Sequence, residues 1–168
     1  MKEGILLIFV ACLCSCSTTI YLVRHGEKVD NSVDPNLSDL GAARAVALKD
    51  TLANAGLKDI YATQYKRTFQ TAKPTADAKN IVIKRYNTLV SDSLITALSN
   101  KKGSNFLVVG HSNTVPDMLR KIGLSPSMQM IPDNDYDNLF IVNITWFFKK
   151  KMKLTQKTYG VASPLVPN

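Results

Sequence analysis

The sequence predicts a single α/β domain: a three-layer sandwich in which a mostly parallel sheet has helices on both faces and ends in a C-terminal hairpin. Short apolar runs alternate with segments of helical periodicity, which is the pattern of parallel strands joined by helical crossovers. The length of 168 residues is that of one domain. The last two apolar runs, 138–148 and 153–159, are separated only by a lysine-rich turn, which indicates a hairpin.

The first predicted strand is "TIYLV" (19–23), and a polar loop over 30–36 follows it. Ser38 is the expected N-cap of the next helix, and Gly56 is expected to end it. Small and apolar residues recur at helical spacing between them, at Gly41, Ala45, Leu48, Leu52 and Ala55. "DIYAT" (59–63) is the second predicted strand.

A helix is predicted over 65–80, where Pro74 removes one backbone hydrogen bond and is expected to bend or break it. The remaining predicted elements are a strand over 81–86, a weaker helix over 91–101, a clear buried strand "NFLVVG" (105–110) and a helix with Pro116 near its first turn. Reactive loops in such sheets gather at the carboxyl ends of the strands.

The N-terminal segment "MKEGILLIFVACLCSCSTT" is expected to lie outside the fold. Its apolar stretch from Gly4 to Leu13 has the length of a signal-peptide core and is too short to span a bilayer. "LCSC" (13–16) resembles a bacterial lipoprotein signal, which implies cleavage after Ser15 and lipid on Cys16. Cys14 and the early acidic Glu3 depart from that pattern. A plain secretory signal or a buried N-terminal strand are the alternatives.

These expectations divide the chain into a signal peptide (1–15), a lipidated cysteine with a short tether (16–19), one domain (20–160) and a C-terminal tail (161–168). The protein is expected to be exported and lipid-anchored in the bacterial cell envelope, on its periplasmic or outer-surface face. The three cysteines are Cys12, Cys14 and Cys16, so the mature domain would hold no internal disulfide.

Composition limits the possible partners. The apolar fraction of 45% and the charged fraction of 20% are those of a globular protein. The net charge of +8 favours an anionic partner or surface. No zinc-finger spacing, RNA-binding aromatic motif or helical arginine stripe accompanies that charge, so nucleic acid is not an expected partner.

Residues of types that commonly act in catalysis follow two of the predicted strands. Arg24 and His25 follow the first strand, and His111 follows "NFLVVG". A lone histidine is more often a hydrogen-bonded structural residue. The chain has only two histidines, however, and both follow strands. Two strand ends can place both histidines in one crevice.

Four blocks in the same order resemble the histidine phosphatase superfamily, also called phosphoglycerate mutase-like. They are "YLVRHGEK" (21–28), "LSDLGAARAVAL" (37–48), "IYATQYKRTFQTAKPTA" (60–76) and "VVGHSNTVPDML" (108–119). The resemblance implies a phosphoglycerate mutase-like fold and a phosphatase that acts on a small phosphorylated substrate or a phosphoprotein. It also implies His25 as nucleophile and Arg24, Arg67 and His111 as the phosphate pocket, with Thr63 and Ser112 nearby.

The residue types suit that chemistry. A phosphomonoester carries nearly two negative charges, and the guanidiniums of Arg24 and Arg67 would neutralise them as fixed forks. Neutral His25 would attack phosphorus and form a phosphohistidine that water hydrolyses. His111 would donate a hydrogen bond to the phosphoryl group. This scheme needs neither a metal nor a cofactor.

The acid that protonates the leaving group is the open point. Many members of this family use a glutamate after the second arginine block, but this chain has none there. Asp92 and Glu27 are equal candidates, each with a structural role as the alternative. Asp117, on the predicted helix after His111, is a further candidate for the acid. Without a placed acid, good substrates would be those with good leaving groups, such as phosphoramidates or acyl phosphates.

Three other motifs in the sequence indicate other functions less well. "GHSNT" (110–114) approaches the serine-hydrolase elbow but lacks its last glycine, and no histidine follows it. "DNDYDN" (133–138) imitates the start of a calcium loop without the required glycine and glutamate, so it indicates a polar loop. The run of Lys149, Lys150, Lys151 and Lys153 indicates a solvated turn, or a contact with anionic lipid headgroups. A mutase and a non-catalytic phosphate-binding or phosphoprotein-binding lipoprotein remain the alternative functions.

Overall fold

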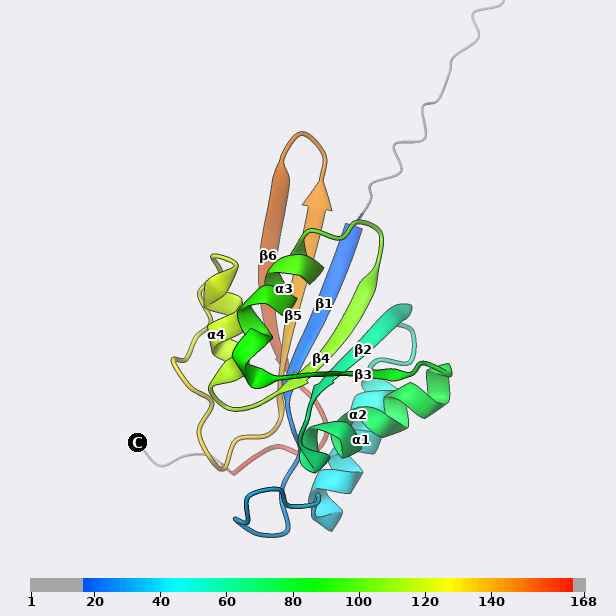
Figure 1. Cartoon of the computed structure of the whole chain (residues 1–168), viewed down its shortest axis with the longest axis vertical. Coiled ribbons are helices and arrows are strands. Elements are labelled where there is room, and N and C mark those ends of the chain that lie inside the picture. The colour runs from blue at the N-terminus through cyan, green and yellow to red at the C-terminus, as the bar shows by residue number, and fades with distance from the viewer. Residues whose placement is uncertain (1–16, 165–168) are drawn as a thin grey trace, which may run out of the picture.

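A computed structural model describes residues 17–164 and shows a six-stranded sheet with helices on both faces (Figure 1). In chain order the elements are β1 (Ser17–Arg24), α1 (Asp39–Thr51), β2 (Leu57–Thr63), α2 (Lys66–Lys79), β3 (Ile83–Tyr86), the short 3₁₀ helix η1 (Thr88–Val90), α3 (Ser91–Ser99), β4 (Asn105–Gly110), α4 (Thr114–Lys121), β5 (Asn138–Trp146) and β6 (Lys150–Thr158). The strand order is β3-β2-β4-β1-β5-β6.

The sheet is mixed. Strands β1 to β4 run parallel to one another. Strands β5 and β6 form an antiparallel hairpin that joins the sheet along β1. The predicted α/β sandwich with a C-terminal hairpin is therefore confirmed.

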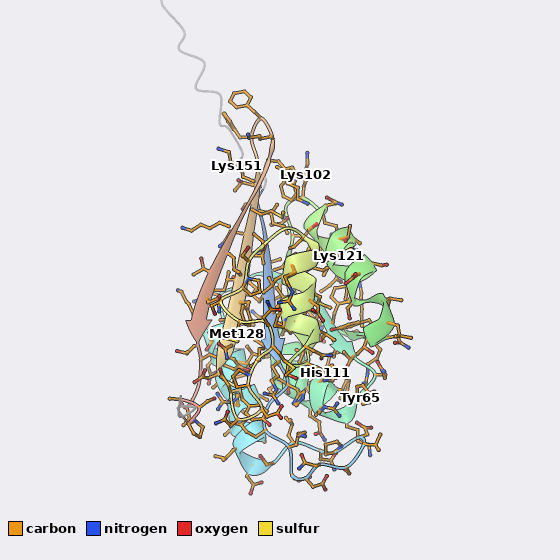
Figure 2. All side chains as sticks on the ribbon, turned by 90° about the vertical axis from the view of Figure 1, so that its left-hand side faces the viewer. Tyr65, Lys102, His111, Lys121, Met128 and Lys151 are labelled. Carbon is orange, nitrogen blue, oxygen red and sulfur yellow. The ribbon has the colours of Figure 1, made fainter. Side chains whose placement is uncertain are left out.

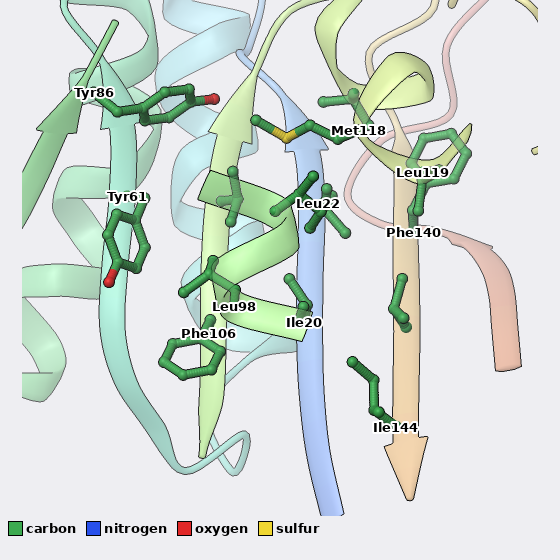
Figure 3. Close-up of a cluster of buried hydrophobic side chains, with 14 of the residues drawn as sticks. Ile20, Leu22, Tyr61, Tyr86, Leu98, Phe106, Met118, Leu119, Phe140 and Ile144 are labelled. Atoms are coloured by element: carbon green, nitrogen blue, oxygen red, sulfur yellow. The ribbon is translucent and has the colours of Figure 1, made fainter. Parts of the chain in front are cut away.

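Alternate residues of the central strands supply two separate cores, because successive strand side chains point to opposite faces. Helices α3 and α4 cover one face, where Ile20 and Leu22 of β1 meet Phe106 of β4 and Met118 of α4 (Figure 3). Helices α1 and α2 cover the other face, where Leu48, Leu52, Ala72 and Ala76 pack against Val23, Ile60, Leu107 and Val109. Both cores are closed by helices from neighbouring crossovers.

The predicted helices and strands are all present, and the structure corrects details of α1 and α2. The Ser38 hydroxyl accepts a hydrogen bond from the Gly41 amide at 3.2 Å and caps α1 as expected. Helix α1 ends at Thr51, before Ala55, and Gly56 takes the left-handed conformation immediately before β2. Helix α2 is continuous through Pro74. Its face of small buried residues packs on α1 and the sheet, which compensates for the one lost hydrogen bond.

The N-terminal boundary also differs from the prediction. Strand β1 begins at Ser17, so residues 17–19 of the predicted tether pair with β5 instead of linking to the domain. The strand starts early because Thr18 is fully buried and its hydroxyl donates to the Lys101 carbonyl at 2.7 Å. At the other end, Ser163 of the predicted tail is held by the Asp137 carboxylate at 2.7 Å.

The predicted signal peptide (1–15) and the lipidated Cys16 lie outside the described residues. Between residues 17 and 164 no helix has the length and apolar character needed to cross a bilayer.

Candidate active site

The two histidines meet where β1 and β4 end. Arg24, the last residue of β1, pairs with Gly110, the last residue of β4. His25 and His111 therefore follow neighbouring strands directly, and their ring centroids lie 5.4 Å apart with an interplanar angle of 67°. The His25 amide donates to the Gly110 carbonyl at 3.1 Å, which extends the strand pairing by one residue. The predicted crevice is present.

A cavity of about 350 Å³ opens at these strand ends. All four predicted site residues line it, together with Ser112 and several residues that the sequence did not single out. The full lining is Arg24, His25, Lys28, Tyr65, Arg67, Thr88, His111, Ser112, Asn113, Thr114 and Asp133. In Figure 2, His111 and Tyr65 lie at this end of the molecule, and their ring centroids are 5.3 Å apart.

His25 is held by the loop that follows β1. Its Nδ1 lies 2.8 Å from the Gly26 carbonyl oxygen. Because a carbonyl only accepts hydrogen bonds, Nδ1 carries the proton and Nε2 is left with its lone pair. The Gly26 amide in turn donates to the Thr71 hydroxyl of α2 at 2.9 Å. The nucleophile candidate thus has a defined tautomer and orientation.

A close backbone contact fixes the same loop against α1. A Cβ atom placed on Gly41 would lie 2.2 Å from the Glu27 carbonyl oxygen, and one on Gly26 would lie 2.9 Å from the Gly41 carbonyl oxygen. Only glycine allows this approach. On the α2 side, the Gln70 amide oxygen accepts from the Leu37 amide at 2.8 Å. The loop is therefore held by both helices of one face.

His111 is oriented by a chain of buried hydroxyls. The Thr68 hydroxyl lies 2.8 Å from the Tyr65 carbonyl oxygen, to which it donates. It therefore accepts from the Thr63 hydroxyl at 2.8 Å, and Thr63 accepts from His111 Nε2 at 3.0 Å. A hydroxyl has a single proton to donate, so this order satisfies the whole chain. Nε2 of His111 carries the proton, and Nδ1 has no hydrogen-bond partner among residues 17–164.

Both histidines are neutral in this environment. Burial lowers the pKa of His25 to about 3, and the positive charges of Arg24 and Arg67 and the nearby His111 act in the same direction. The hydrogen bond to Gly26 opposes this shift but does not cancel it. Burial also lowers the pKa of His111 to about 4, with Arg67 and Arg24 contributing. A neutral imidazole is the nucleophilic form.

The two arginines are anchored differently. Arg24 is 4% exposed, and its Nη1 donates to the carbonyls of Pro132 and Asp135 at 2.6 and 3.0 Å. Arg67, on the first turn of α2, stacks on the Tyr65 ring at 4.4 Å. The Nε atoms of both guanidiniums are buried and lack a hydrogen-bond partner among the described residues. Two cations with unused donors beside a neutral imidazole suit a phosphoryl group.

The carboxylates predicted as acid candidates do not line the cavity. Glu27 forms a bidentate ion pair with Arg44 of α1, at 2.6 Å for its shortest contact. Asp92 lies 3.2 Å from the Lys121 amine, and Asp117 lies 2.6 Å from Arg120. Their positions therefore favour the structural role over the role of acid for both Glu27 and Asp92. Each is engaged in an ion pair elsewhere.

One wall of the cavity was missed from the sequence. The segment 131–137 before β5 crosses the site, because Ile131 donates its amide to the Ser112 carbonyl at 2.9 Å. Tyr136 of this segment stacks on the Arg24 guanidinium at 4.1 Å. Asp133 lines the cavity, but its side chain is 97% exposed and lies 3.8 Å from Arg24. The "DNDYDN" loop is thus polar, as predicted, and also holds Arg24.

Comparison with known proteins finds similarity both in sequence and in structure. The model of the histidine phosphatase superfamily (branch 1) matches residues 20–91. Phosphoserine phosphatase 1 of Hydrogenobacter thermophilus is 35% identical over 109 residues, which cover 61% of this chain and 49% of that protein. The matched region thus spans about half the length of this curated relative.

Solved structures share the fold. A mycobacterial glucosyl-3-phosphoglycerate phosphatase superposes with a TM-score of 0.67 at 13% identity, over 82% of this chain and 97% of that chain. The protein histidine phosphatase SixA, solved with tungstate, gives 0.64 at 15% identity, over 83% and 96%. At these identities the superpositions establish the architecture alone.

An α/β sandwich that brings two histidines and two arginines together at the ends of adjacent parallel strands defines a phosphoglycerate mutase-like protein. Residues 20–91 match the model of the histidine phosphatase superfamily, and the described chain has the fold of solved phosphatases.

Among residues 17–164, no three His, Cys, Asp or Glu side chains gather as a metal site would require. The independence from metals implied by the sequence stays a prediction and is tested below.

Proposed function

We propose that this protein is a phosphatase that transfers a phosphoryl group to His25 and then to water. The observation that carries this proposal is the state of His25: it is buried and neutral, its Nδ1 is bound to Gly26, and its Nε2 has no hydrogen-bond partner among residues 17–164, in a cavity that Arg24 and Arg67 also line. A histidine so placed is prepared to attack an electrophile that carries negative charge.

The reaction has two steps. The Nε2 lone pair of His25 attacks phosphorus, and the bond from phosphorus to the leaving atom breaks with its electron pair on that atom. Arg24 and Arg67 bind the phosphoryl oxygens while their charge spreads over the transition state. Water then attacks the phosphohistidine, the phosphorus–nitrogen bond breaks, and neutral His25 and inorganic phosphate result.

His111 supports both steps. Its Nε2 proton is committed to Thr63, so the nitrogen available to a ligand is Nδ1. A phosphoryl group that enters as a monoanion brings a proton, which Nδ1 accepts and then shares with a phosphoryl oxygen. The dianionic ligand would stabilise this imidazolium and raise its pKa from about 4. His111 becomes a charged donor only while phosphate is bound.

The carboxylate positions favour one class of substrate. Of the acidic side chains described, only that of Asp133 lines the cavity, and it is almost fully exposed and close to Arg24. An alkoxide leaving group needs a proton donor, whereas the imidazole of a phosphohistidine can take a proton from solvent at the ring nitrogen remote from phosphorus and then leave as a neutral molecule. Phosphoramidates, including phosphohistidine in proteins, are therefore the favoured substrates, and acyl phosphates come next. Simple alkyl phosphates such as phosphoserine are the weaker alternative.

A phosphate-release assay separates this proposal from its rivals. The panel is a phosphohistidine protein, acetyl phosphate, p-nitrophenyl phosphate, phosphoserine and 3-phosphoglycerate, each with wild type and with His25→Ala. A hydrolase releases phosphate from at least one substrate, and His25→Ala does not. A mutase would isomerise phosphoglycerate with little phosphate release. A non-catalytic binding protein would bind phosphate without releasing it from any substrate, and this result would refute the proposal.

We further propose that the protein is exported and held in the cell envelope by lipid on Cys16. The support is the lipoprotein-like "LCSC" at 13–16 after a ten-residue apolar stretch, Gly4 to Leu13. Cys16→Ser should abolish labelling by radioactive fatty acid and move the protein from the membrane to the soluble fraction. Cys14→Ser is the matched control and should keep the label. A wild-type protein that is unlabelled and soluble would exclude the anchor.

A further inference from the structure

The end of the molecule opposite the active site exposes two aromatic rings. Phe147 and Phe148 form the tip of the β5–β6 hairpin, and they are 65% and 94% exposed. Their ring centroids are 4.4 Å apart, so they form one apolar projection. Exposed adjacent phenylalanines have no packing role within the fold and mark a contact surface.

Three chain segments meet at this end. Thr145, just before the rings, pairs with Ser17, the first residue of β1. The α3–β4 loop lies beside them, since the Lys102 amine is 5.8 Å from the centroid of the Trp146 ring. Figure 1 shows the hairpin tip and the start of β1 at the same end of the sheet. Figure 2 places Lys102 and Lys151 there, far from His111 and Tyr65.

The rings are surrounded by positive charge alone. Segments 99–105 and 145–153 contain no Asp or Glu and contribute six lysines. We call the two rings and these lysines the basic aromatic end; its members are Phe147, Phe148, Lys101, Lys102, Lys149, Lys150, Lys151 and Lys153. All of the lysines are exposed except Lys150, which is half-buried and bonded to Ser99 and Asn100. Apolar side chains in a lysine cluster are the composition of a surface that binds anionic membranes.

We propose that the basic aromatic end rests on an anionic lipid bilayer, with Phe147 and Phe148 inserted at the headgroup boundary and the lysines facing lipid phosphates. The segment that precedes β1 in the sequence favours a lipid bilayer over other partners for this surface. Ser17, the first described residue, lies at this same end, and the apolar stretch Gly4 to Leu13 comes shortly before it in the sequence. A second copy of the chain would place lysines against lysines, which opposes self-association. The proposal does not depend on the phosphatase activity.

Trp146 offers a direct test because it is the only tryptophan of the chain and adjoins Phe147. The full-length protein is mixed with phosphatidylglycerol–phosphatidylcholine vesicles whose acyl chains are brominated, and its fluorescence is recorded. Contact predicts a blue shift of Trp146 emission and quenching by bromine, several-fold stronger than with phosphatidylcholine alone and weakened by salt. Quenching reports the position of this end even if lipid on Cys16 holds the protein at the vesicle.

The variant Phe147→Ser/Phe148→Ser should lose most of the quenching, and Lys149→Gln/Lys151→Gln/Lys153→Gln should lose its dependence on phosphatidylglycerol. Val82→Ser/Val161→Ser removes two comparably exposed apolar residues elsewhere and should quench like wild type. Circular dichroism confirms that each variant is folded. Equal quenching in wild type and the phenylalanine variant would overturn the proposal. So would a blue shift that grows with protein concentration in the absence of vesicles, since it would show self-association.

Discussion

The Nε2 atom of His111 lies 3.0 Å from the hydroxyl of Thr63, a fully buried residue at the end of β2. This contact fixes the orientation of the His111 ring, although Thr63 itself does not line the cavity. The hydroxyl of Thr68 continues the chain into the first turns of α2. The second histidine is therefore positioned by the strand and helix that also deliver Arg67.

Replacing Thr63 by Val should slow turnover on the order of tenfold, because the ring loses the acceptor that fixes its tautomer. The lost hydrogen bond should also lower the free energy of unfolding by about 1–3 kcal/mol. Steady-state kinetics should show the loss in kcat with KM little changed. Thr63→Ser keeps the hydroxyl and is the control. If Thr63→Ser is as slow as Thr63→Val, the hydroxyl is not the cause.

His25→Ala should abolish turnover, and His111→Ala and Arg67→Ala should each cost on the order of a hundredfold or more. The fold should persist, because these residues lie at a cavity and not in either core. Rapid quenching under alkaline conditions should trap labelled phosphate on wild type and not on His25→Ala. Substantial turnover by a pure His25→Ala preparation would contradict the mechanism.

The two histidines should not titrate in the usual range. Their pKa values of about 3 and about 4 keep both rings neutral well below the value of about 6.5 that is typical of histidine. The chain has no other histidine, so NMR of the imidazole protons reads the site directly. The free protein should show flat shifts between about pH 8 and pH 5.5. Vanadate should raise the pKa of His111; an unchanged value would exclude its role as a charged donor.

The same shifts predict how stability depends on pH. In the unfolded chain each histidine binds a proton below about pH 6.5, whereas in the folded protein it stays neutral down to about 3 or 4. The unfolded chain therefore binds more protons in this window, and stability falls as the pH falls, by up to about 1.4 kcal/mol per pH unit for each histidine. Urea denaturation at several pH values measures the slope, and His25→Ala should show a shallower one.

Removing the candidate acids should separate structure from catalysis. Glu27→Gln should lower the free energy of unfolding by about 2 kcal/mol, because Arg44 is 5% exposed and would lose its ion pair. Asp92→Asn should change stability by less than about 0.5 kcal/mol, since its ion pair is exposed. Neither should alter the ratio of rates for alkyl and aryl phosphates. A selective loss on alkyl phosphates would restore that residue as the acid.

Chelation of divalent ions tests whether the two arginines are sufficient to neutralise the charge of the phosphoryl group. In the proposed mechanism the guanidiniums of Arg24 and Arg67 neutralise the charge that a divalent ion would otherwise neutralise, so EDTA should leave phosphate release unchanged. Loss of activity that a divalent ion restores would count against this mechanism.

The sequence predicted the elements and the four cavity residues well, because strand ends and family blocks are local signals. The positions of Glu27 and Asp92 were not predictable in this way. Glu27 is two residues from His25 along the chain, yet its side chain turns to Arg44 of α1, and no local pattern distinguishes that partner. Spacing along the chain does not report the direction of a side chain in a loop.

The position of Tyr136 beside Arg24 depends on where the predicted hairpin joins the sheet. The predicted hairpin begins at residue 138, and the polar loop precedes it. Had the hairpin been placed antiparallel to the first strand, its start would have fallen beside Arg24, since Leu139 pairs with Val23. Sheet order is a long-range property that periodicity does not provide, so this wall of the site required the structure.

Strand β1 sets the distance between the basic aromatic end and the cavity. Its eight residues separate Ser17 at the basic aromatic end from Arg24 at the cavity, a length of about 23 Å at the usual rise per residue. With that end seated on a bilayer, the cavity would open away from the membrane at this height. Phosphorylated lipid headgroups in the same leaflet would lie beyond its reach. The accessible substrates would be molecules in the adjoining aqueous compartment. They would also include phosphorylated proteins that hold their phosphate at a similar distance from the membrane surface.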